Sequence, residues 1–369
     1  MREVIQKEAT NSIIKNDYQG ILLVAPRVGK SKIIIDSLLL SSFKSILIVA
    51  PLNSILDSWE VEIEKWGREI RERVMLVNQR SIKDKHKADI IICDECHTLS
   101  KAQITKIRAM KFDRVLGSTG TISDANYKEL RPICKKIIYN YSIANAIKDE
   151  IISNYNITVI TCQLDSKDKY VPAGTVKKPF KTTEQGAYDY FTKEFNKFRV
   201  LAFKDKKYEN IKYMYAGKRS RLIYGAKSKI NITKRLIQKI KGKKLIFTIL
   251  NDVADELAKY SYHSGIKSKV RDYNLELFRD GKINDLSVCN MLSMGFTDKR
   301  LKTGIFHQLQ SSEEPAQQKI MRMCNYVEGE TADVYILAYE GTVDIDWLNK
   351  ALQPFNSKKI TYDSWRNYI

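Results

Sequence analysis

The residues Val24 to Ser31, which read Val-Ala-Pro-Arg-Val-Gly-Lys-Ser, could bind a phosphate group. An apolar run precedes this loop and an apolar helical stretch follows it, so the loop would open a helix whose first N–H groups attract anions. Gly29 would let the backbone close around the phosphate, Lys30 would reach the β- and γ-phosphates, and the Ser31 hydroxyl would bind Mg²⁺. The alternative is a glycine turn followed by a surface lysine, because the strict motif has glycine in place of Val24. The candidate nucleotide-binding residues of the loop are Arg27, Val28, Gly29, Lys30 and Ser31.

A second candidate group is the acidic pair Asp94 and Glu95, which follows the apolar run Ile90–Cys93. The run predicts a buried strand, and ligands of parallel α/β sheets bind at the carboxyl ends of such strands. Asp94 could hold Mg²⁺ through water, and Glu95 could polarise an attacking water molecule. A strand end with solvated acids is the alternative, and the phosphate loop upstream argues against it. Cys93 and Cys96 form a CxxC pair, but no second pair follows at zinc-ligand spacing.

Positive charge is concentrated in residues 161–250. The chain has 369 residues and a net charge of +20, and this stretch holds 23 Lys+Arg against 7 Asp+Glu. It also holds seven tyrosines, and a basic zone with interleaved aromatic residues suits a phosphate backbone with bases to stack on. A solvated face in a lysine-rich chain is an equal alternative from composition. The tyrosines include Tyr188, Tyr190, Tyr208, Tyr213 and Tyr215.

The elements that must position these groups alternate between strands and helices. In the first part, strands are predicted at 21–25, 45–50, 74–77, 89–93 and 114–117, with helices at 31–40 and 53–66. In the last part, strands are predicted at 244–250, 286–291, 303–306 and 332–337, with helices at 252–259, 271–278, 314–325 and 344–352. Such alternation predicts parallel sheets covered on both faces. We therefore expect an α/β chain with one domain at 1–140, a basic, mostly helical insert at 141–225 and a second domain at 226–369.

Composition excludes several classes of protein. Hydrophobic residues make up 43% and charged residues 29% of the chain, which is ordinary for a globular protein and excludes disorder as its main state. No apolar run approaches the ~18 residues of a membrane span, and the start of the chain lacks the apolar region of a signal peptide. Six cysteines are too sparse for a disulfide scaffold. We expect a cytoplasmic protein, in the host cytoplasm if it is viral, without a membrane partner.

In their order, these motifs resemble those of superfamily 2 helicases and translocases of the DExH kind, and in particular phage and Swi/Snf-like DNA helicases. The resembling segments are 5–9, 24–31, 50–66, 94–97, 117–121, 243–247, 262–265, 293–298 and 317–322. The likeness covers nearly the whole chain and is least specific in the insert. It implies two tandem RecA-like domains that share ATP and Mg²⁺.

The resemblance also implies residue roles. Gln6 would read adenine, and Arg322 would act as an arginine finger across the interdomain cleft. The implied catalytic residues are Lys30, Glu95 and Arg322, and the implied metal ligands are Ser31 and Asp94. Further nucleotide contacts would come from Gly295, Asp298 and Gln318. Nucleic-acid contacts would come from Pro51, Leu52, Asn53, Thr119, Thr121 and His263.

The function expected from the sequence is an ATP-dependent DNA helicase or translocase in phage or bacterial DNA replication, recombination or repair. DNA is the preferred partner because segment 50–66 and the insert resemble those of DNA translocases. Two alternatives stay open: an RNA helicase, and a nucleic-acid-stimulated ATPase switch without unwinding.

Overall fold

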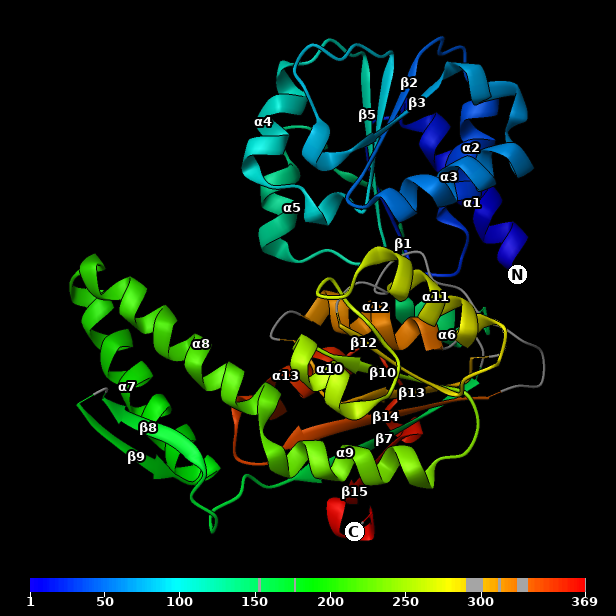
Figure 1. The fold of residues 1–369 in the computed structure, drawn as a ribbon. Helices are drawn as coiled ribbons and strands as arrows, with labels where there is room; N and C mark the ends of the chain where they lie inside the picture. Colours follow the sequence, from blue (N-terminus) through cyan, green and yellow to red (C-terminus); the bar gives the residue numbers. More distant parts are fainter. Residues whose placement is uncertain (152–153, 176, 290–300, 311–312, 324–330, 369) are drawn as a thin grey trace.

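The structure, a computed structural model, describes residues 1–151, 154–175, 177–289, 301–310, 313–323 and 331–368. It contains two sheets of parallel strands, each flanked by helices, and a helical arm that projects beside the second sheet (Figure 1). The predicted α/β class, with two tandem parallel sheets and a helical insert, is confirmed.

The first sheet has the strand order β3-β2-β4-β5-β1-β6, and all its neighbouring strands are parallel. Its strands are β1 (Gly20–Val24), β2 (Ile46–Ala50), β3 (Val74–Asn78), β4 (Ile90–Asp94), β5 (Arg114–Thr119) and β6 (Ile137–Tyr141). Strands β2 and β4 are buried along their whole length, which is why both read as continuous apolar runs.

Helices cover both faces of this sheet. Apolar residues of α1, α2 and α3 pack in one core, and those of α4 and α5 pack in another. The helices are α1 (Arg2–Lys15), α2 (Lys30–Leu39), α3 (Asn53–Trp66), α4 (Lys101–Ala109) and α5 (Asp124–Leu130). A capping box formed by Ser100 and Gln103 fixes the start of α4.

The second sheet has the strand order β11-β12-β10-β13-β14-β7-β15, again with parallel neighbours throughout. Its strands are β7 (Asn154–Cys162), β10 (Lys244–Thr248), β11 (Ser261–Tyr262), β12 (Asp285–Cys289), β13 (Thr303–Phe306), β14 (Thr331–Tyr339) and β15 (Ile360–Ser364). Strand β7 lies in the range expected to form the insert, yet it pairs with β14 and β15. The second sheet therefore takes one of its inner strands from before the arm.

The helices of the second half are α6 (Ile143–Lys148), α9 (Lys227–Lys239), α10 (Asn251–Leu257), α11 (Ser268–Arg279), α12 (Glu313–Met323) and α13 (Val343–Leu352). Apolar residues of α9 and α10 pack on one face of the sheet, and those of α11, α12 and α13 belong to the core on the other face. Helix α6 contributes Ile143 and Ala146 to the core that continues from the first sheet.

The arm comprises α7 (Glu184–Lys204) and α8 (Glu209–Gly225), which pack against each other. A small antiparallel hairpin of β8 (Val171–Thr175) and β9 (Lys178–Thr182) precedes it. The Thr183 hydroxyl caps α7 by accepting a hydrogen bond from the Gly186 N–H at 3.0 Å. We keep the name "arm" for residues 184–225.

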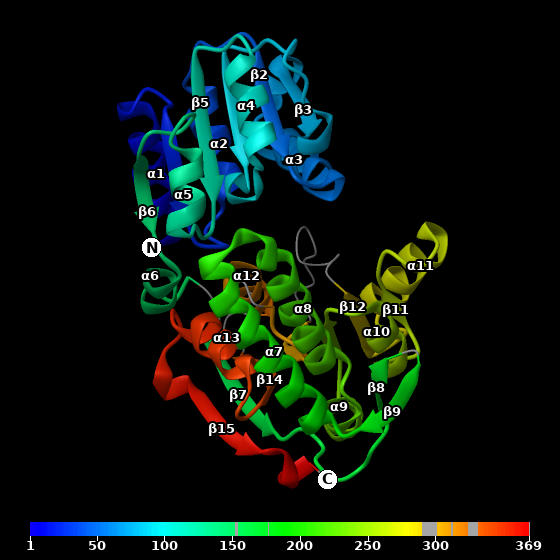
Figure 2. The ribbon, with the colours of Figure 1, turned by 90° about the vertical axis from the view of Figure 1, so that its left-hand side faces the viewer.

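The carboxyl ends of the first sheet's strands point toward the second half, and α12 lies on the side of the second half that faces them (Figure 2). Within the described residues, every helix is too short or too polar to cross a membrane.

Candidate functional site

The phosphate loop lies between β1 and α2, as the sequence predicts. Gly29 has a φ of 103°, a left-handed conformation that glycine adopts without strain. A Cβ atom at this position would lie 2.5 Å from Nε2 of Gln6, so a side chain would also clash there. Lys30 is the first residue of α2, where the helix N-terminus favours an anion.

Gln6 lies directly against this loop. Its Nε2 donates a hydrogen bond to the Val28 carbonyl at 2.7 Å, and its side chain is buried between α1 and the loop. The structure thus brings the predicted adenine-binding residue into contact with the predicted phosphate loop. Arg27 has a positive φ of 74° in the same loop.

Lys30 and Glu95 form an ion pair. The Lys30 Nζ lies 3.0 Å from the Glu95 Oε1, and each side chain is 15% exposed. Burial on its own lowers the pKa of Lys30, but the carboxylates of Glu95 and Asp94 outweigh it and raise the pKa above its usual value. The lysine therefore stays cationic and holds the glutamate in the absence of a phosphate.

Asp94 is held by three donors. Its Oδ1 accepts from the Ser118 hydroxyl at 2.6 Å and from the Glu95 N–H at 3.0 Å, and its Oδ2 accepts from the Trp59 indole at 2.9 Å. Burial, followed by the nearby Glu95, raises the pKa of Asp94, while Lys30 and the two side-chain donors oppose the rise. A carboxylate fixed in this way has its orientation set before any ligand arrives.

Trp59 and Ser118 are site residues that the sequence did not reveal. Trp59 of α3 is buried, with 2% exposure, and its indole orients Asp94. Ser118 lies on β5 directly opposite Asp94 of the neighbouring strand β4. The sequence alone does not show that β4 and β5 are neighbours. With the strand order known, Ser118 could have been found as the residue opposite Asp94.

The donor set suits Mg²⁺. Two adjacent carboxylates, Asp94 and Glu95, end one strand, and a divalent cation would relieve the unfavourable interaction that raises the pKa of Asp94. Mg²⁺ keeps several water ligands and takes few from protein, and those are oxygens such as the Asp94 carboxylate and the Ser31 hydroxyl. Among the described residues there is no cluster of three or more His, Cys, Asp or Glu, so a dedicated transition-metal cage is not seen in that part of the chain.

His97 and Thr119 lie next to Glu95. The His97 Nδ1 lies 3.5 Å from the Glu95 Oε2 and 2.7 Å from the Thr119 Oγ1, which itself donates to the Thr121 carbonyl at 2.7 Å. Burial lowers the pKa of His97, so the ring is neutral at pH 7. Thr119 is fully buried, so the structure places this predicted nucleic-acid residue one step behind the acidic pair.

The other predicted nucleic-acid residues lie on both halves. Pro51, Leu52 and Asn53 follow β2 at the same carboxyl edge as Lys30, and the Asn78 side-chain amide donates to the Asn53 Oδ1 at 2.8 Å. His263 follows β11 in the second half, where it is buried at 3% exposure and its Nε2 lies 2.9 Å from the Asp255 Oδ1.

Four predicted residues are not fully described. Gly295 and Asp298 lie outside the described residues. Gln318 and Arg322 belong to α12, but their side chains lie outside the described part of the chain.

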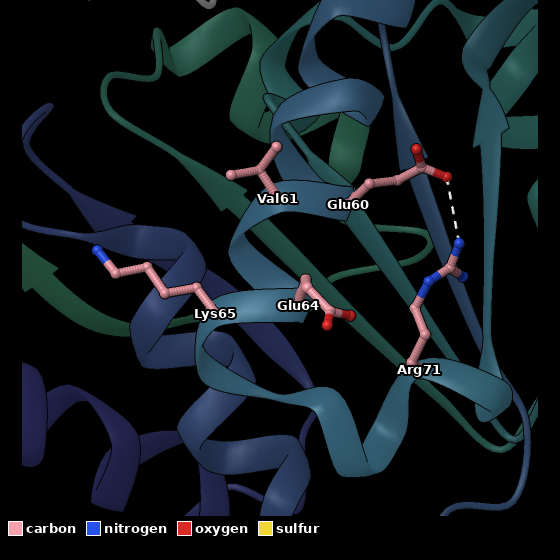
Figure 3. A pocket seen from close by; sticks show the side chains of 5 residues that line it. All are labelled: Glu60, Val61, Glu64, Lys65 and Arg71. Atoms are coloured by element: carbon pink, nitrogen blue, oxygen red, sulfur yellow. Dashed lines mark hydrogen bonds and ion pairs between the residues drawn. The ribbon is translucent and has the colours of Figure 1, made fainter.

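Two surface hollows lie apart from the acidic pair. One, on the outer face of α3, contains an ion pair between Glu60 and Arg71 at 3.3 Å and is completed by Val61, Glu64 and Lys65 (Figure 3). None of these residues forms one of the hydrogen bonds or ion pairs described for Lys30 and Asp94. The other lies at the carboxyl ends of β10 and β12, and its lining residues are Arg221, Ile249, Leu250, Asn251, Asp252, Ser264 and Cys289.

No family model and no curated protein matches the sequence. Solved structures do share its architecture. Dbp5 of S. cerevisiae, bound to RNA and ADP BeF3, matches with a TM-score of 0.64 and 11% identity over 99% of this chain and 90% of Dbp5. The ATP-dependent Type ISP restriction-modification enzyme LlaBIII, bound to DNA, matches with a TM-score of 0.64 and 12% identity.

The chain shares the fold of these two proteins, which is two RecA-like domains in tandem. The two parallel sheets described above are the centres of those domains. The match to LlaBIII covers 98% of this chain but 31% of that enzyme, so the chain spans about a third of its length.

Proposed function

We propose that the protein is an ATP-driven DNA motor, a helicase or duplex translocase of the DExH type. The observation that carries this proposal is the meeting of Lys30, Asp94 and Glu95 at the carboxyl edge of the first sheet, with a 3.0 Å ion pair between the lysine and Glu95. This edge faces the second sheet, so a nucleotide held there would lie between the two domains (Figure 2).

The residues act in sequence. Lys30 exchanges Glu95 for the β- and γ-phosphates of ATP, and Gln6 lies where it can contact the base. Glu95, released from the lysine, orients a water molecule and accepts its proton as the water attacks the γ-phosphorus. The bond from this phosphorus to the bridging oxygen breaks, and ADP is the leaving group. Asp94 and Ser31 would hold Mg²⁺, which would neutralise negative charge on the phosphates.

Hydrolysis is coupled to movement by closure of the second domain. Arg322 belongs to α12, a helix on the side that faces the first domain, and acts as the arginine finger in this proposal. Gly295, Asp298 and Gln318 complete the nucleotide contacts from the same domain. Closure and opening shift the grip of Pro51–Asn53 on one side and of the loop that contains His263 on the other, so that each cycle advances the protein along the strand.

DNA is the proposed track, in phage or bacterial replication, recombination or repair. The likeness of segment 50–66 to DNA translocases supports this choice, and LlaBIII is a structural neighbour described as bound to DNA. RNA is the second candidate, because Dbp5 is described as bound to RNA. The basic segment 161–250 suits either backbone and predicts steep salt dependence of binding.

The test is ATP hydrolysis measured with duplex, forked and single-stranded DNA and with RNA. We expect stimulation by DNA, and loss of turnover in Lys30→Ala and Glu95→Gln. Lys32→Ala is the matched control, because Lys32 lies on the same helix but pairs with Asp36 at 2.6 Å, and its turnover should equal that of the wild type. Stimulation by RNA and not by DNA would favour an RNA helicase instead. ATP turnover that no oligonucleotide stimulates would refute the proposal of a nucleic-acid motor.

A further inference from the structure

The tip of the arm carries an unusual side chain. Phe203, in the last turn of α7, is 94% exposed, which is the highest exposure among the large apolar side chains of the described residues. Burying a phenylalanine side chain contributes about 1.5–3 kcal/mol of stability, and Phe203 contributes almost none of this because it is not buried in the described chain. The exposed ring is therefore available to a binding partner.

Four other aromatic rings of the arm have a structural use that Phe203 lacks. Phe198 of α7 stacks on Tyr215 of α8, with ring centroids 5.6 Å apart and an angle of 9° between the planes. Tyr190 meets the edge of the same Tyr215 ring at 6.3 Å, and Tyr208 lies 6.0 Å from Phe198. These contacts join the two helices, so the arm does not need Phe203 for its own packing.

Charge around the tip favours a nucleic acid as the partner. The arm holds ten Lys+Arg and five Asp+Glu, and Lys204, Lys206 and Lys207 follow Phe203 at its end. Lys207 pairs with Asp205 at 2.8 Å, whereas Lys204 and Lys206 are exposed. A single ring with cations beside it matches a base and its neighbouring phosphates, whereas a protein interface needs a larger apolar patch.

The base of the arm is fixed to the second domain by hydrogen bonds. Glu184, at the start of α7, is fully buried and accepts from the Asp165 N–H at 3.0 Å and the Ser228 N–H at 3.2 Å. The Tyr188 hydroxyl accepts from the Val343 N–H at 2.9 Å, at the start of α13. The tip consequently moves with the second sheet.

We propose that Phe203 stacks on an unpaired nucleobase and that Lys204 and Lys206 bind the adjacent phosphates. The arm tip is then a nucleic-acid contact separate from the edges of the two sheets, and it selects single-stranded or forked over fully paired DNA, because a paired base offers no free face. This inference rests on the proposed function and specifies its substrate as DNA that contains unpaired bases.

The test uses the full chain and a single-stranded DNA oligonucleotide that contains 2-aminopurine, whose fluorescence is quenched when a ring stacks on it. We expect the wild type to quench this fluorescence and Phe203→Ala to abolish the quenching and weaken binding by about 5- to 150-fold, as for loss of one stacked base. Phe203→Trp should restore both signals. The exposure of Phe203 leaves the fold unaffected by these changes.

Val200→Ala is the matched control, because Val200 lies one turn earlier on α7, is 58% exposed and has no ring. It should bind and quench like the wild type. Equal quenching and affinity in Phe203→Ala and Val200→Ala, with wild-type ATP turnover still stimulated by DNA, would overturn the tip contact alone and point to a protein partner for the ring. Absence of stimulation in the wild type would instead refute the proposed function.

Discussion

Replacing Glu95 by glutamine should strengthen nucleotide binding while it stops hydrolysis. The Lys30–Glu95 pair at 3.0 Å has a gross Coulomb energy of about 5 kcal/mol at an effective dielectric constant of about 20. Much of this is offset by lost hydration of two side chains that are each 15% exposed, which leaves a net of about 1–3 kcal/mol. ATP must displace Glu95 from Lys30, so removing the pair should tighten binding by about 5- to 150-fold.

The assay is titration of a fluorescent ATP analogue, with turnover measured in parallel. The raised pKa of Lys30 means that the cation is lost only as the pH rises through a value above 10.5, so the gain in affinity should be constant between pH 7 and 9. Glu129→Gln is the control, because Glu129 forms a surface pair with Lys101 at 3.4 Å, and its affinity should stay within about twofold of the wild type. If Glu95→Gln abolished turnover but bound the analogue no more tightly, the pair would not compete with ATP and this reasoning would be wrong.

Three further outcomes are expected. Trp59→Phe removes a donor to Asp94, the proposed Mg²⁺ ligand, and should raise the Mg²⁺ concentration for half-maximal turnover by about 10- to 100-fold. Trp66→Phe on the same helix, 41% exposed, should not change it. Lys229→Met leaves Asp344, its fully buried partner at 2.6 Å, unpaired and should lower the free energy of unfolding by about 3–5 kcal/mol in urea denaturation, an effect that adding Asp344→Leu should largely reverse. Burial lowers the pKa of His307 to about 3, so between about pH 6.5 and 3 the unfolded state binds a proton that the folded state does not. The free energy of unfolding should therefore fall by about 1.4 kcal/mol per pH unit below about 6.5. His307→Asn should remove this slope in urea denaturation.

Local apolar patterns were sufficient to predict most of the first sheet. The predicted helix 53–66 has the observed bounds, and the predicted strands of this sheet differ from the observed ones by one or two residues at their ends. Strands β2 and β4 are buried on both faces, so each reads as an uninterrupted apolar run.

The strands that the sequence did not reveal lack such a run. Strand β7 reads Asn-Tyr-Asn-Ile-Thr-Val-Ile-Thr-Cys, and its polar residues disguise an inner strand. Its partner Thr331 lies far along the chain from Asn154, so no turn signal joins them. Strand β15 is a polar edge strand, and the hairpin of β8 and β9 has mostly exposed side chains, so neither has an apolar face to detect.

The site shows the same limit. Lys30 and the acidic pair could be proposed because each lies in a short motif whose chemistry is local. Trp59 and Ser118 could not, because they reach Asp94 from other elements, and a hydrogen bond between distant segments leaves no spacing pattern. Composition also could not tell the tyrosines of the arm apart: Tyr188 is buried against the second domain and Tyr215 pairs with Phe198, whereas Tyr213 is 59% exposed.

The described chain passes from the first sheet to the second at one place only, from edge strand β6 through α6 into inner strand β7. Helix α6 is packed rather than free, with Ile143 and Ala146 buried. Any torque that the backbone transmits between the two sheets therefore passes through this stretch, in which α6 is held by its buried residues. A protease cut in this stretch would uncouple the two halves mechanically while each kept its own sheet intact.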